Sequence, residues 1–157
     1  MNPLARRALI VTVCLVFASP LSAAWLENGF VPDPLPGEQS SAAVCSDGAG
    51  GMIVVFGDTR SGTSHIYSQR VNALGQPLWA AGGVVVCDYS AGEQVNPCIA
   101  EDGAGGAYIA WEDFVPSTSM QGIYAQHLTS AGVRTWNAAG LAIASGHRRD
   151  FSSPVIA

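Results

Sequence analysis

The sequence predicts an all-β fold made of four-stranded units, and three observations carry this prediction. The pentapeptide DGAGG occurs twice, at residues 47–51 and 102–106. Short segments rich in β-branched and aromatic residues flank both copies, and glycine-containing corners separate these segments. After residue 24, no segment repeats apolar residues at the helical period. We therefore expect strands joined by tight turns.

The pentapeptide belongs to a longer internal repeat. Residues 38–60 align with 93–115 at an offset of 55, with 8 identities in 23 positions. Residues 66–87 align with 123–144 at an offset of 57, with 7 identities in 22 positions. Each copy contains four expected strands, which lie at 42–46, 52–58, 65–73 and 83–87 in the first copy and at 97–101, 107–113, 122–130 and 140–144 in the second.

A four-stranded unit that repeats every roughly 40 to 55 residues is typical of a β-propeller blade. The prediction is a partial propeller over residues 25–157, with repeat one at 38–87 and repeat two at 93–144. Residues 25–31 match the last strand of a blade, and 150–157 match the first strand of a third repeat. Because a propeller ring needs about four or more blades, we expect a fragment of a longer polypeptide that carries further blades.

Residues 1–24 have the features of a cleaved signal peptide: two arginines, an apolar run too short to span a membrane, and small residues at the cleavage point. The prediction is export, to the cell surface or the medium, without membrane insertion of the mature chain. After cleavage, 5 arginines and 12 acidic residues give a net charge of −7, which argues against nucleic acid as a partner. The chain has no lysine, which excludes a Walker-type phosphate loop.

DGAGG could be an anion-binding nest, a calcium turn or a plain β-hairpin connection. No helix follows it to offer an N-terminus to a phosphate, and each copy carries few carboxylates. The hairpin is favoured, with Asp47 and Asp102 bonding to their own backbone and the glycines at positive φ.

The remaining polar residues predict no catalytic, cofactor-binding or metal-ligating site. Glu112 and Asp113 are neighbours in a strand and point to opposite faces, so they are unsuited to act on one bond. Asp58 and Asp113 are expected to cap the second hairpin by accepting backbone N–H bonds. Arg60 beside these carboxylates is reminiscent of glycan-cleaving propellers, but the second repeat has Val115 at its place.

Several side chains recur at matching positions, which indicates packing or a hydrogen bond between blades; an exposed aromatic could instead stack on a sugar. These are Tyr67 and Tyr124, Gln69 and Gln126, and Trp79 and Trp136, and the two tryptophans are expected to belong to the core at a blade edge. The histidines, at 65, 127 and 147, show no metal or triad spacing. Three cysteines remain in the mature chain, and apolar strand positions are favoured for them over a structural disulfide. They are Cys45, Cys87 and Cys98.

The combined pattern D-G-x-G-G-x4-W-x-D, I-Y-x-Q and G-x3-W resembles a repeat of large secreted bacterial proteins. It rests here on Asp102, Gly103, Gly105, Gly106, Trp111, Asp113, Ile123, Tyr124, Gln126, Gly132, Trp136 and their counterparts in the first copy. Phe56 departs from it where the second copy has Trp111. The resemblance implies a β-propeller and often a sorting or surface-attachment domain. The expected function is a non-enzymatic scaffold that binds protein or glycan. The alternative is the propeller part of a secreted glycan-active hydrolase or lyase.

Overall fold

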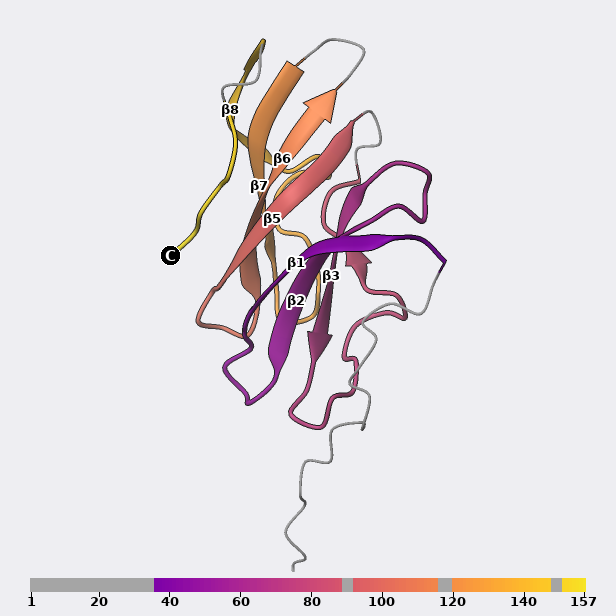
Figure 1. Cartoon of the computed structure of the whole chain (residues 1–157). Helices are drawn as coiled ribbons and strands as arrows, with labels where there is room; N and C mark the ends of the chain where they lie inside the picture. Colours follow the sequence, from indigo (N-terminus) through magenta and orange to yellow (C-terminus); the bar gives the residue numbers. More distant parts are fainter. Residues whose placement is uncertain (1–35, 89–91, 116–119, 148–150) are drawn as a thin grey trace, which may run out of the picture.

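The computed structural model describes residues 36–88, 92–115, 120–147 and 151–157 (Figure 1). These residues form two antiparallel four-stranded sheets, and no helix occurs among them. The described part of the chain accordingly holds no helix long and apolar enough to cross a membrane.

In each sheet the strands lie side by side in chain order. The first sheet contains β1 (Gln39–Ser46), β2 (Met52–Asp58), β3 (His65–Val71) and β4 (Val84–Val85). The second contains β5 (Glu93–Glu101), β6 (Ala107–Val115), β7 (Met120–Leu128) and β8 (Leu141–His147). Below, residues are called equivalent when they lie 55 apart up to residue 60, or 57 apart from residue 64 onward.

Both first strands contain a bulge at the same place. The register of β1 on β2 breaks between Ser40 and Ala43, and that of β5 on β6 breaks between Val95 and Cys98. Ser41 has a φ of 51° and its equivalent Asn96 a φ of 52°. This left-handed conformation is uncommon outside glycine and bends the strand at the bulge.

The main core lies between the two sheets, where β5 contacts β1, β2 and β3 (Figure 1). Its buried members come from both sheets: Val55, Ile66, Val86, Cys87, Ile109, Trp111 and Leu128. The central strand β2 is an almost continuous apolar run because both of its faces are covered.

A buried glutamine ties the sheets together by polar contacts. The N–H of Gln94 on β5 donates to the carbonyl of Ser64 at 2.9 Å, and the Ser64 hydroxyl donates to the carbonyl of Gln94 at 2.9 Å. The Gln94 side chain accepts the N–H of Ile66 at 3.1 Å. These bonds fix the position of β5 along the edge of β3.

All eight predicted strands are present, with shifted ends. β1 begins at Gln39 and β5 at Glu93, earlier than predicted, because the bulge lets the preceding residues pair as well. β4 is reduced to Val84–Val85. The all-β prediction is confirmed. The described residues form two sheets and no closed propeller. The predicted signal peptide and the predicted strand at 25–31 lie outside the described residues.

Candidate functional site

Each DGAGG segment closes a hairpin with its own aspartate, as predicted. Asp47 Oδ1 accepts the N–H of Ala49 at 2.8 Å and the N–H of Gly51 at 2.7 Å. Gly48 and Gly50 have φ values of 70° and 84°, where a side chain would be strained. Asp102 makes the same two bonds in the second sheet, at 2.7 and 2.8 Å. This carboxylate oxygen is therefore occupied by the turn in both sheets.

The other oxygen of each aspartate holds a cationic or cationisable side chain. Asp47 Oδ2 lies 3.0 Å from both Nε and an Nη of Arg70, and Asp102 Oδ2 lies 2.8 Å from His127 Nε2. Burial by itself would raise the pKa of both carboxyls. The backbone N–H bonds and the Arg70 or His127 side chain outweigh it and hold each pKa below its usual value. The turns are internally satisfied, which leaves little for a ligand to bind.

The recurring glutamines hold the connection between the third and fourth strands of their own sheet. Gln69 is fully buried; its Oε1 accepts the N–H groups of Arg70 and Trp79 at 3.0 Å, and its Nε2 donates to the Ala80 carbonyl at 2.8 Å. Gln126 makes the equivalent three bonds, at 3.1, 3.0 and 2.9 Å. For these glutamines the sequence predicted either packing or a hydrogen bond between blades. The bonds described here act within one sheet and do not link one sheet to the next.

The recurring tyrosines pack against the aromatic residue of the neighbouring strand. Tyr67 stacks on Phe56 with ring centroids 6.4 Å apart, and Tyr124 stacks on Trp111 at 6.3 Å. The predicted packing role is confirmed for this pair.

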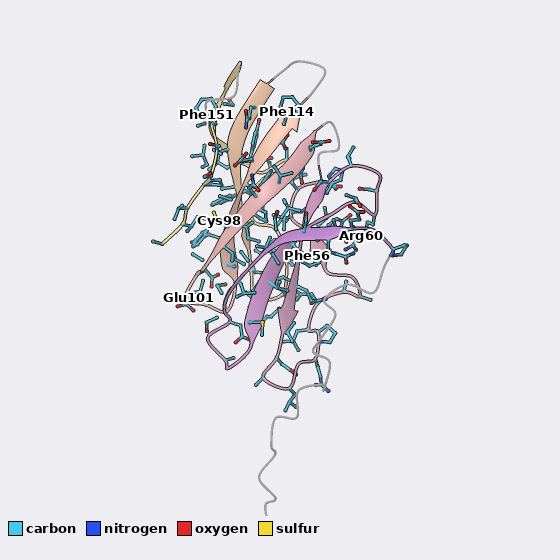
Figure 2. The ribbon with its side chains drawn as sticks, viewed as in Figure 1. Phe56, Arg60, Cys98, Glu101, Phe114 and Phe151 are labelled. Atoms are coloured by element: carbon cyan, nitrogen blue, oxygen red, sulfur yellow. The ribbon has the colours of Figure 1, made fainter. Side chains whose placement is uncertain are left out.

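The first sheet contains an arginine that the second lacks. Asp58 Oδ1 accepts the N–H of Arg60 at 2.6 Å, which confirms its predicted capping role. The guanidinium of Arg60 donates to Asp58 Oδ2 and to the carbonyl of Gly82, each at 2.9 Å. It also lies 3.8 Å above the centroid of the Tyr67 ring, a cation–π contact (Figure 2 labels Arg60). The guanidinium is thereby held in place beside β3.

The equivalent aspartate of the second sheet is Asp113, and the sequence has Val115 at the place of Arg60. Asp113 is buried, and its Oδ1 has no hydrogen-bond partner among the described residues. Burial raises its pKa, and Trp111, His65 and Gln94 act in the opposite direction. The loop that it was predicted to cap includes 116–119, outside the described residues.

Glu112, the neighbour of Asp113 in the sequence, contacts different residues. Its Oε1 accepts from the Asn96 side chain at 3.1 Å and from the Ser153 N–H at 2.7 Å. The two adjacent carboxylates therefore serve different partners, as their alternation along β6 predicts.

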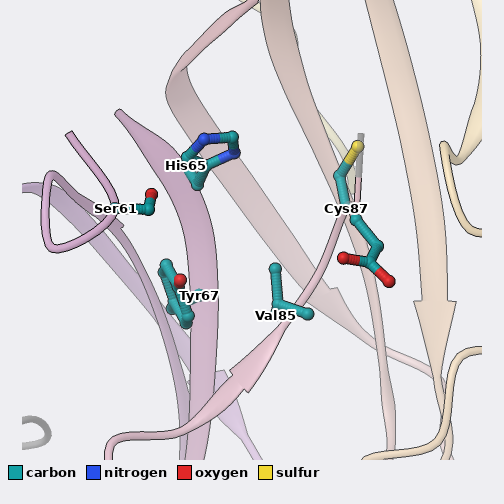
Figure 3. Close-up of a pocket in the computed structure, with 6 residues that line it drawn as sticks. Ser61, His65, Tyr67, Val85 and Cys87 are labelled. Carbon is teal, nitrogen blue, oxygen red and sulfur yellow. The ribbon is translucent and has the colours of Figure 1, made fainter. Parts of the chain in front are cut away.

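A pocket of about 140 Å³ opens on the first sheet (Figure 3). Its lining comes from the β2–β3 loop, from β3 and from the chain around β4: Ser61, His65, Tyr67, Val85, Cys87 and Asp88. His65 is 6% exposed, and its Nε2 lies 2.9 Å from the Thr63 hydroxyl. The lining thus combines an imidazole, hydroxyl groups, a carboxylate and an aromatic ring held by Arg60.

The lining has no copy in the second sheet, where Gly122 and Ala144 are equivalent to His65 and Cys87. Its volume is well below the roughly 300 to 1,000 Å³ of a pocket that encloses a small molecule. The pocket is suited to one polar end group of a larger ligand.

The described part of the chain contains possible metal ligands and cysteine thiols. No three His, Cys, Asp or Glu side chains among them lie close enough to hold a metal ion. Cys45, Cys87 and Cys98 are free thiols. Burial raises the pKa of Cys45 to about 11, with further increases from Glu101, Asp102 and Asp47, and burial also raises the pKa of Cys98. Both thiols are thus held in the less reactive protonated form.

Two features escaped prediction from the sequence. The pocket joins residues of the β2–β3 loop, of β3, of β4 and of the segment after β4, and no spacing in the sequence relates them. The Asp102–His127 pair could have been suspected, because the alignment places His127 opposite Arg70 and Asp102 opposite Asp47. The side chain of His147 lies outside the described residues.

Comparison of the chain with protein-family models, with curated proteins and with solved structures gave no match.

Proposed function

We propose that this protein is an exported, propeller-type repeat scaffold that binds a protein or a glycan through the pocket of the first sheet and catalyses no reaction. The observation that carries the proposal is the use of the polar side chains. Those that recur, such as Asp47 and Asp102 or Gln69 and Gln126, bind their own sheet in the same way. Some of those that do not recur, such as His65 and Ser61, line the pocket.

The propeller architecture is supported by the relation between the sheets. Both have the same strand order, and the first strands β1 and β5 contact each other, as the innermost strands of adjacent blades would. The left-handed residue recurs a third time, at Ser153 with a φ of 55°, where the proposed third repeat begins. A propeller presents its loops at the two ends of the strands, and the pocket lies at one such end.

The test is retention of ligands by the immobilised chain that lacks residues 1–24. Polysaccharides and extracellular proteins are offered in parallel, and one class should be retained without change in its size. Ser61→Arg, at an exposed loop position of the pocket, should weaken retention by at least about tenfold, since every 1.4 kcal/mol of binding is tenfold. Ala49→Arg is the matched control, because it is exposed at the opposite end of β2.

Unchanged retention by Ser61→Arg would place binding elsewhere and contradict the proposal. Shortened glycan chains in the same assay would favour the alternative, a propeller of a glycan-active hydrolase or lyase.

A further inference from the structure

Trp79 and Trp136 are equivalent residues, but their indole side chains differ in exposure. Each donates its backbone N–H to the buried glutamine of its own sheet at 3.0 Å, so both are held in the same way. Trp79 is half-buried and packs against the core between the sheets, whereas Trp136 is 37% exposed. The two tryptophans also differ in what lies over the indole ring.

A glycine turn of the second sheet covers Trp79. A Cβ added to Gly132 would lie 2.9 Å from the indole ring, so only a glycine allows this approach. The indole N–H of Trp79 and the guanidinium of Arg70 both donate to the Ser130 carbonyl, each at 3.1 Å. The turn therefore covers the indole ring with Gly132, and its Ser130 carbonyl accepts hydrogen bonds from Trp79 and Arg70.

The same place on the second sheet carries three side chains without such a cover, Tyr108, His127 and Trp136, which we call the Trp136 face. Their ring centroids lie 4.6 to 6.4 Å apart, and Tyr108 is 40% exposed. Its equivalent in the first sheet, Ile53, is fully buried. In the described part of the chain, nothing corresponds to the turn at residues 129–133 on this face.

Residues 151–157 show which element belongs beside this face. They run alongside the second sheet, as Figure 1 shows, and begin at Phe151, which Figure 2 labels and which is equivalent to Gln94 in the sequence. The carbonyl of Phe151 accepts from the Gln121 side chain at 2.9 Å, just as the carbonyl of Gln94 accepts from Ser64. This segment therefore lies on the second sheet in the way that β5 lies on the first.

We propose that the Trp136 face is the docking surface for the glycine turn of a third four-stranded sheet whose first strand is residues 151–157. The inference rests on the repeat architecture proposed above. The turn at residues 72–76 shows that the required shape is not peculiar to the second sheet. Gly75 has a φ of 76°, against 75° for Gly132, and donates to Asn72 at 2.9 Å as Gly132 donates to Thr129 at 2.8 Å.

The test supplies the missing strands to the full chain. A second copy of residues 46–88 is appended directly after Ala157, because Ala157 and Cys45 occupy equivalent positions. Hydroxyl-radical oxidation of Trp136 is then measured by mass spectrometry on the tryptic peptide 135–148, which occurs once in the extended chain. Oxidation of Trp136 should fall several-fold, to the level of Trp79 in the unextended chain.

Two controls separate docking from simple crowding. A scrambled segment of the same length should leave the oxidation of Trp136 unchanged. Valine in place of the appended copy of Gly75 should restore the oxidation, because its side chain would meet the indole ring.

Three outcomes would each overturn the inference. They are an appended segment that stays unfolded by hydrogen exchange, one that folds while Trp136 stays reactive, and protection of Trp136 in the unextended chain by added oligosaccharide. None of them bears on the pocket, which the Ser61→Arg comparison tests separately.

Discussion

β1 and β5 have the same bulged course and opposite surroundings. Gln94 on β5 is fully buried and accepts the Ile66 N–H, whereas its equivalent Gln39 on β1 is exposed and donates to Asp58 of its own sheet and to the carbonyl of Gly37. Val44 on β1 is 60% exposed, while its equivalent Ile99 packs against the core. The comparison teaches that this strand obtains its burial from the preceding sheet, so a single sheet is an incomplete folding unit.

Replacing the two glutamines should therefore give the largest contrast. Gln94→Ala leaves the N–H of Ile66 buried without an acceptor, and we expect it to lower the free energy of unfolding by about 2 to 3 kcal/mol. Gln39→Ala, at an exposed position, should lower it by no more than about 0.5 kcal/mol. Urea unfolding at neutral pH measures both. Equal losses would show that the two strands have the same surroundings in solution and would break the comparison.

The aspartates of the DGAGG turns should give the next largest effect. Asp47→Asn weakens a two-point contact with Arg70, which also reaches the second sheet, and should cost roughly 1 to 2 kcal/mol of unfolding free energy. Asp102→Asn weakens one contact with His127 and should cost less, about 1 kcal/mol.

The pH dependence of these losses has a definite sign. Both pKa values are lowered in the folded state, so each carboxylate stabilises the fold above its unfolded pKa of about 3.9. This stability disappears as the pH falls through the lower, folded pKa. Unfolding measured between pH 7 and pH 2 should show both variants approaching the unmodified chain at the acid end. A gap that stayed constant over this range would contradict the role of the ionised carboxylate.

The sequence predicted local structure better than it predicted contacts between sheets. The period of DGAGG and the alternation of residues 65–73 located every strand of the described residues, because turn chemistry and strand burial act over a few residues. The bonds of Asp47 to its own turn followed from the same local rules. Gln94, in contrast, lies before the predicted strand at 97–101, and nothing in the sequence marked it as buried. Its burial depends on Ile66, 28 positions earlier in the chain, and no local pattern encodes that distance.

The pocket and the Trp136 face show the same limit. His65 and Cys87 line one space because the chain after β4 continues beside β3, where the Val86 N–H donates to the Ile66 carbonyl, and their separation in the sequence carries no periodic signal. Trp136 was expected to be core because Trp79 and Trp136 align. The alignment of Trp79 with Trp136 holds for their backbone bonds to Gln69 and Gln126. The exposure of each side chain also depends on the neighbouring sheet, which the aligned residues do not determine.

The smallest expected effect separates Asp58 from its equivalent Asp113. Asp58 binds Arg60, whereas Asp113 Oδ1 has no hydrogen-bond partner among the described residues. Because burial raises the pKa of Asp113, its contribution to stability is complete below the unfolded pKa of about 3.9 and is lost as the pH rises through the folded value. Asp113→Asn avoids this loss, so it should raise the free energy of unfolding by up to about 1 kcal/mol at pH 7 and by nothing near pH 3.

Asp58→Asn is the matched variant, and it should destabilise the chain at pH 7 because it removes the charge that holds Arg60 above Tyr67. Paired urea titrations at pH 3 and pH 7 decide the point. If Asp113→Asn destabilises the chain at pH 7 as Asp58→Asn does, the groups around ionised Asp113 outweigh the cost of its burial, and the two sheets are more alike than their contacts indicate.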